Sequence, residues 1–134
     1  MSMGAEPWSY YAPFEPSVSA ALETLRQRVF KSGEFRGSEM NPATPEEAIQ
    51  NMDADGTGSI LDILGVSATP DFSSVSPLPE SDLISLYDTL QPTREMIESN
   101  MDFYDDIERG QGIYIVVYKD GKPDEYFFAG YSFD

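Results

Sequence analysis

Carboxylates are the main side chains through which this chain could do chemistry. Its 134 residues include 24 Asp and Glu but no Cys and no His. The missing residues exclude Cys nucleophiles, the Ser-His-Asp triad and zinc sites built from thiolates or imidazoles. Paired carboxylates can catalyse glycosidase-type hydrolysis, yet among so many acids neighbouring pairs are expected by chance. We therefore expect no catalytic residue and no cofactor, and we favour a binding protein over an enzyme.

One carboxylate spacing is typical of a cation site. Residues 53–60 (DADGTGSI) follow the start of an EF-hand calcium loop, with Asp53, Asp55 and Thr57 in ligand positions. Ca²⁺ takes about six to eight oxygens, and the loop normally completes them with a bidentate Glu where this chain has Leu64. We therefore expect an Asp- and Gly-rich turn that binds no metal. A metal site at Asp53, Asp55 and Thr57 is the less favoured alternative.

A second group of carboxylates lies on a helix that the sequence predicts over residues 93–108. At 100° per residue, five acids fall within about a third of its circumference, and Ile97, Phe103 and Ile107 lie on the opposite side. Repulsion between neighbouring like charges costs about a few tenths of a kcal/mol per pair. The stripe is either a solvated face or a surface for a basic partner. Its members are Glu95, Glu98, Asp102, Asp105 and Asp106.

The charge of the whole chain supports the same two interpretations. Eight basic residues against 24 acidic ones give a net charge of −16, and residues 39–108 hold 16 acids and a single base, Arg94. Such repulsion disfavours binding to nucleic acid or to an anionic membrane. No stretch approaches about 18 consecutive apolar residues, and the N-terminal segment lacks the pattern of an export signal. We therefore expect a cytoplasmic protein with no membrane association.

The N-terminal part predicts one strand and two helices. Residues 8–14 are aromatic and flanked by prolines, which is typical of an edge strand. Apolar residues at helical spacing predict a helix that begins after Ser17 and ends at Gly33. A capping box at Thr44 begins a short helix that extends to about Met52.

The middle of the chain predicts mostly loop and helix. Residues 53–80 are rich in Gly, Pro and Ser, with one helical turn at 60–64. A helix over residues 80–90 follows, and it ends before Pro92, which separates it from the helix at 93–108. In the helix over residues 80–90, the residues predicted to be buried are Leu83, Ile84 and Tyr87.

The C-terminal part predicts a β-hairpin. Two β-prone runs, 113–118 and 126–129, flank Asp120-Gly121, a sequence that favours a type I′ turn. That turn would pair Ile115 with Tyr126 and leave both hairpin faces apolar, so both faces need a cover. The predicted fold is α+β: a small antiparallel sheet that includes this hairpin, packed with about four helices.

Several segments together are similar to those of a known protein group. They include Glu15-Pro16 before the first helix, residues 44–48 (TPEEA), residues 105–110 (DDIERG) and residues 127–134 (FFAGYSFD). The set resembles a group of small acidic bacterial proteins of unassigned function. This resemblance implies a bacterial, cytoplasmic protein with one domain over residues 1–134, and it implies no catalytic or binding residue.

These observations favour a non-enzymatic acidic interaction domain that binds a basic protein partner, as an inhibitor or immunity-type protein would. The five acids of the 93–108 stripe are the candidate contact residues. The alternative is a small enzyme or ligand-binding domain that uses carboxylates and tyrosines in a pocket beside the hairpin.

Overall fold

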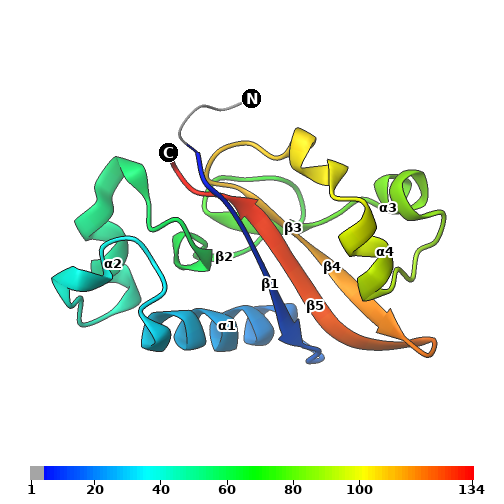
Figure 1. The fold of residues 1–134 in the computed structure, drawn as a ribbon, viewed down its shortest axis with the longest axis horizontal. Helices are drawn as coiled ribbons and strands as arrows, with labels where there is room; N and C mark the ends of the chain where they lie inside the picture. Colours follow the sequence, from blue (N-terminus) through cyan, green and yellow to red (C-terminus); the bar gives the residue numbers. More distant parts are fainter. Residues whose placement is uncertain (1–4) are drawn as a thin grey trace.

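The computed structural model describes residues 5–134 and has an α+β fold, as the sequence predicts. Five strands form one sheet in the spatial order β1-β5-β4-β3-β2 (Figure 1). The strands are β1 (Pro7–Pro13), β2 (Gly65–Val66), β3 (Ser74–Pro77), β4 (Gly112–Lys119) and β5 (Lys122–Tyr131). The α-helices of the described residues are α1 (Val18–Ser32), α2 (Pro45–Met52), α3 (Glu80–Tyr87) and α4 (Arg94–Ser99). Short 3-10 helices are η1 (Ser38–Met40), η2 (Asp53–Asp55), η3 (Ile60–Asp62) and η4 (Asp102–Asp106).

The hairpin of β4 and β5 has the predicted turn but a different register. Asp120 and Gly121 have φ values of 53° and 77°, and a type I′ turn requires positive φ at both positions. Ile115 pairs with Phe127, so the predicted pairing with Tyr126 is wrong by one residue. A register shift close to the turn, where a bulge adds one residue to β5, causes the difference.

The sheet is larger than predicted and is mixed rather than purely antiparallel. The aromatic N-terminal segment is the expected edge strand, β1, antiparallel to β5. On the other side of the hairpin, β3 lies parallel to β4, and β2 lies parallel to β3. Both added strands come from residues 53–80, which were predicted to be mostly loop. Strands this short carry almost no periodic pattern, so their pairing depends on tertiary contacts.

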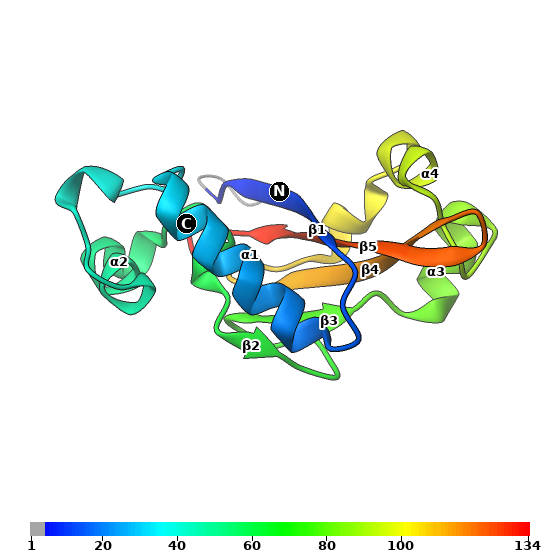
Figure 2. The same ribbon diagram turned by 90° about the horizontal axis from the view of Figure 1, so that it is seen from below.

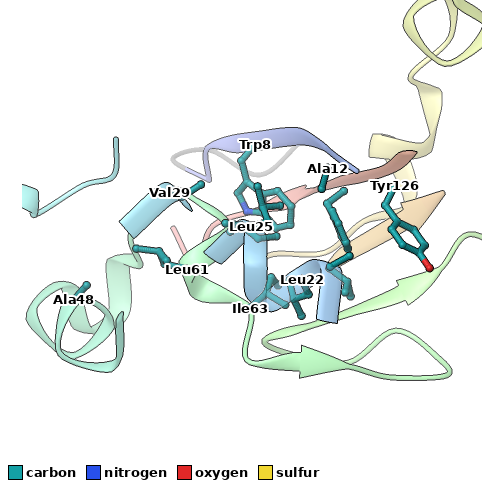
Figure 3. Close-up of a cluster of buried hydrophobic side chains, with 13 residues drawn as sticks. Trp8, Ala12, Leu22, Leu25, Val29, Ala48, Leu61, Ile63 and Tyr126 are labelled. Carbon is teal, nitrogen blue, oxygen red and sulfur yellow. The ribbon is translucent and has the colours of Figure 1, made fainter. Parts of the chain in front are cut away.

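Helices cover the two apolar faces of the hairpin, as predicted (Figure 2). α1 lies on one face, and Figure 3 shows its side chains Leu22 and Leu25 near Trp8 of β1. The predicted caps of this helix are confirmed: the Ser17 hydroxyl accepts a hydrogen bond from the Ala20 N–H, and the helix ends at Gly33. The hydrophobic cluster between α1 and the sheet has fully buried members that include Ala21, Ile60, Leu61, Ile63, Val75 and Phe128.

The opposite face is covered by shorter elements. Side chains from α3, α4 and η4 pack against Ile113, Ile115 and Phe127 of the hairpin. Helix α3 is shorter than predicted, because Asp88 adopts a left-handed conformation and ends it. Ile84, predicted to be buried, is 47% exposed.

The predicted helix over residues 93–108 is not continuous. Thr93 caps α4, which ends at Asn100, and the chain then forms the separate 3-10 helix η4. The Asn100 main-chain carbonyl accepts a hydrogen bond from the Tyr87 hydroxyl at 2.7 Å, and its side-chain Oδ1 accepts one from the Asp102 N–H at 3.0 Å. Crowded carboxylates weaken a continuous helix, and these hydrogen bonds stabilise the break.

Candidate functional site

A hollow of about 260 Å³ lies between α3 and η4, on the side of the sheet opposite to α1. We call it the acidic hollow. Three apolar side chains, Leu78, Leu86 and Phe103, form part of its lining, and Leu78 and Phe103 are buried. Four aspartates also line it, and no basic residue does so among the described residues. These aspartates are Asp82, Asp102, Asp105 and Asp106.

The two sides of the acidic hollow are held together at Asn100. Besides accepting from Tyr87 of α3, Asn100 donates from its side-chain nitrogen to the Leu86 carbonyl at 3.4 Å. Burial and the nearby charge of Asp102 raise the pKa of Tyr87 to about 12. The phenol therefore stays protonated at neutral pH and keeps its hydrogen bond to Asn100. This connection fixes η4 beside α3.

The structure divides the predicted acidic stripe. All five of its carboxylate residues are exposed, as predicted, but only the three on η4 line the acidic hollow. Glu98 accepts a hydrogen bond from the Tyr11 hydroxyl at 3.1 Å, and Glu95 lines a different cleft. Asp82 was not predicted to be a site residue. Its only signal was an acid in the first turn of a helix, and nothing in the sequence relates that helix to η4.

A second cleft, of about 550 Å³, lies between the start of α4 and the hairpin turn. Its charges are mixed: Glu95, Asp120, Asp124 and Glu125 face a lining that also contains Arg94, Lys119 and Tyr118. Arg94 pairs with Glu125 at 3.3 Å and stacks over the Tyr11 ring, 3.7 Å from its centroid. This cleft has the carboxylates and the tyrosine of the pocket that was predicted beside the hairpin as the alternative.

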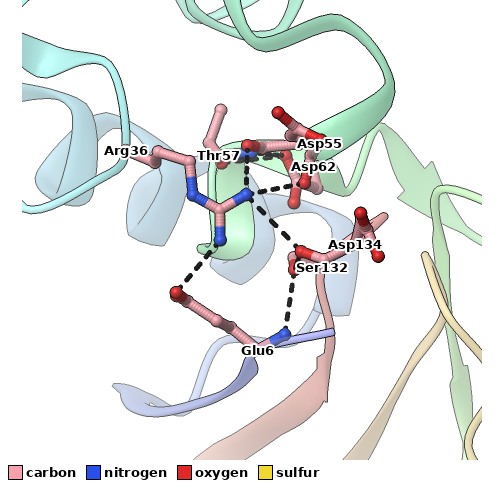
Figure 4. Close-up of polar contacts among 8 residues, drawn as sticks. Glu6, Arg36, Asp55, Thr57, Asp62, Ser132 and Asp134 are labelled. Atoms are coloured by element: carbon pink, nitrogen blue, oxygen red, sulfur yellow. Dashed lines mark hydrogen bonds and ion pairs between the residues drawn. The ribbon is translucent and has the colours of Figure 1, made fainter. Parts of the chain in front are cut away.

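The segment with EF-hand spacing forms a structural turn (Figure 4). The carboxylate that holds this turn is Asp62, two residues beyond the segment, and it is fully buried. Asp62 Oδ1 accepts hydrogen bonds from the Thr57 N–H at 2.7 Å and the Thr57 hydroxyl at 2.8 Å, while Oδ2 has no hydrogen-bond partner among the described residues. Burial raises the pKa of Asp62, and the hydrogen bonds from Thr57 and the charge of Arg36 partly offset this effect.

The predicted alternative metal ligands are not brought together. Asp53 and Asp55 are exposed, whereas Thr57 is buried and uses its hydroxyl on Asp62. The Arg36 guanidinium donates to the Asp55 carbonyl at 2.8 Å and pairs with Glu6 at 3.1 Å (Figure 4). Within residues 5–134 no three acidic side chains gather in a way that could hold a metal ion.

Comparisons with family models, with curated proteins and with solved structures returned no match. In the part of the chain that the structure describes, no helix is long and apolar enough to span a bilayer.

Proposed function

We propose that this protein is a non-enzymatic interaction domain that binds a basic protein partner through the acidic hollow. The lining of that hollow supports the proposal. Four aspartates surround its apolar side chains, and none of the described residues that line it is basic. With the resemblance noted above, we place this function in the bacterial cytoplasm.

The lining matches a lysine or arginine side chain of the partner. Such side chains combine a long apolar stem with a charged end, and the stem packs on apolar surface while the charge stays near water. In the acidic hollow the stem would lie on Leu78, Leu86 and Phe103. The charged end would then meet the carboxylates of Asp102, Asp105 and Asp106. The remaining negative charge of the chain would speed the encounter.

Four like charges around one hollow lower the stability of the protein on its own. Exposed carboxylates without counter-charges repel each other, and salt screens this repulsion over about 8–10 Å. A cationic side chain would relieve it. The same arrangement predicts that binding weakens steeply with rising salt, since charge attraction drives the association.

The test is affinity capture from bacterial cells at low salt, followed by binding kinetics with the captured partner. We expect Asp102→Asn combined with Asp105→Asn to slow association about tenfold at low salt and to flatten its salt dependence. The matched control is Asp53→Asn combined with Asp55→Asn, which removes the same charge from exposed positions elsewhere. Equal effects of the two double variants would contradict the acidic hollow as the binding site.

A second candidate function is small-ligand binding in the cleft at the hairpin turn. Its volume of about 550 Å³ and its mixed charges suit a small zwitterionic metabolite. A thermal-shift screen of amino acids and similar zwitterions tests it. A rise in melting temperature that is lost in Lys119→Ala, but kept in Lys31→Ala, would favour this candidate over protein binding.

A further inference from the structure

The two edges of the sheet differ in their capacity to pair with another strand. β2, at one edge, has only two residues. β1, at the other edge, has seven and pairs with β5 along its whole length on one side only. Figure 2 shows β1 along the edge of the sheet that lies farthest from β2. An edge strand of this length can recruit a further strand unless something blocks it.

The outward hydrogen-bonding groups of β1 follow from its pairing with β5. The Phe14 N–H donates to the Asp124 carbonyl, and the Ser132 N–H donates to the Glu6 carbonyl. The N–H and C=O groups of even-numbered residues therefore point toward β5. Odd-numbered residues then direct theirs outward, since the direction alternates along an antiparallel strand. Both prolines of β1, at positions 7 and 13, are at outward positions and have no N–H. The outward donors are therefore the N–H groups of Ser9 and Tyr11.

One outward acceptor is already occupied. The Arg28 guanidinium donates to the Tyr11 carbonyl at 3.1 Å. Among residues 5–134, no hydrogen bond is donated to the carbonyls of Pro7 and Ser9, so a new strand can use them. The outward edge thus offers two N–H donors, at residues 9 and 11, and two carbonyl acceptors, at residues 7 and 9. The acceptors lie two residues before the donors in the chain.

We propose that β1 joins two copies of this chain, in an antiparallel pair centred on Ser9. In that register each Ser9 N–H donates to the Ser9 carbonyl of the second copy, and each Tyr11 N–H donates to the Pro7 carbonyl. Both outward donors are used. The Tyr11 carbonyl stays with Arg28, because the proline opposite it has no N–H to offer. A pair centred on Tyr10 would instead bring the Ser9 N–H to the occupied Tyr11 carbonyl.

The distribution of charge allows two copies to meet at this edge. Residues 1–38, which include β1 and α1, contain four acids and four bases, although the chain as a whole carries −16. Like-charge repulsion between copies is therefore weaker here than at the surface formed by residues 39–108. The pairing would also place Tyr10, which is partly buried, opposite Trp8 of the second copy. This inference does not depend on the acidic hollow or on its partner.

The first test is the mass of the full chain by sedimentation at about 10–500 µM and physiological salt. We expect a concentration-dependent dimer. Ser9→Pro removes the central donor without affecting the pairing with β5, so it should be monomeric with an unchanged circular dichroism spectrum. Ser9→Ala keeps the N–H and should remain dimeric. A wild-type chain that is monomeric throughout, or a folded Ser9→Pro variant that still dimerises, would overturn the proposal.

A second test does not require the proline variant to fold. The chain has no Cys, so Ser9→Cys introduces a single thiol. Directly opposite residues of a hydrogen-bonded antiparallel pair have Cα atoms about 5.5 Å apart, within the range of a disulfide. Mild oxidation should cross-link Ser9→Cys at least about tenfold faster than Ser19→Cys, a control at an exposed serine of α1. Equal rates for the two variants would contradict pairing at Ser9.

Discussion

The acidic hollow and the turn around Asp62 are both rich in carboxylates, but their carboxylates have opposite roles. In the turn, Asp62 is fully buried and accepts two hydrogen bonds from Thr57. In the hollow, Asp102, Asp105 and Asp106 are exposed. A buried carboxylate without hydrogen bonds would cost several kcal/mol, whereas an exposed one costs little. Burial therefore decides which aspartates hold the fold together and which remain available to a partner.

The largest expected difference between the two regions is in the cost of removing a carboxylate. Asp62→Ala removes the acceptor of the buried Thr57 N–H and leaves the Thr57 hydroxyl with Ser59 as its remaining partner, and it should lower the free energy of unfolding by about 3 kcal/mol. Asp102→Ala removes an exposed carboxylate and should change it by less than about 0.5 kcal/mol. Urea unfolding followed by circular dichroism measures both. Similar losses would show that the two regions do not differ in this way.

Close packing around Asp62 gives the next largest effect. Gly56 has a φ of 74°, and a Cβ there would lie 2.8 Å from Asp62 Oδ2 and 3.0 Å from the Phe133 nitrogen. Gly56→Ala should therefore cost about 2–3 kcal/mol, the sum of backbone strain and crowding. The control is Gly121→Ala, with a φ of 77° and no atom within 4 Å, which should cost about 1–2 kcal/mol from strain alone. Thermal unfolding of the two variants compares them.

The buried carboxylate of the turn should make the stability of the protein depend on pH. Burial raises the pKa of Asp62 above its ordinary value of 3.8, so the folded protein holds this proton more tightly than the unfolded chain. Between 3.8 and the raised pKa, the stability of the wild type relative to Asp62→Asn should fall as pH rises. The slope should not exceed about 1.4 kcal/mol per pH unit. A wild type that tracks Asp62→Asn at every pH in urea unfolding would contradict this assignment.

The smallest expected effect belongs to charge removal in the hollow. Asp105→Asn combined with Asp106→Asn should stabilise the protein by about a few tenths of a kcal/mol, because it relieves like-charge repulsion. The gain should shrink when salt is added, since salt screens the repulsion. Unfolding at low and high salt measures it. A clear loss of stability would show that these carboxylates have structural partners.

Elements with local signals were predicted well. The caps Ser17 and Thr44, the glycine that ends α1, and the Asp120-Gly121 turn each depend on residues a few positions apart. The exposure of the acids on α4 and η4 also follows from residue type, because unpaired carboxylates avoid the core. Local chemistry was sufficient for these features.

Predictions that required long-range contacts were wrong or incomplete. The break at Asn100 depends on Tyr87, which is 13 residues away, and no helical periodicity indicates it. Asp82 joins the acidic hollow only because α3 packs beside η4. The burial of Asp62 was not expected either, since the sequence places an ordinary acid in a Gly-rich turn.

The sequence by itself determined the chemistry that is possible here: carboxylates and tyrosines, an acidic middle segment, and a hairpin with two apolar faces. The tertiary structure alone decided which carboxylates are buried and which acids share a hollow. It also decided which main-chain groups of β1 remain unpaired. The physical reason is that residue type and local spacing set propensities and charge, whereas burial and strand pairing depend on segments that are distant in the sequence.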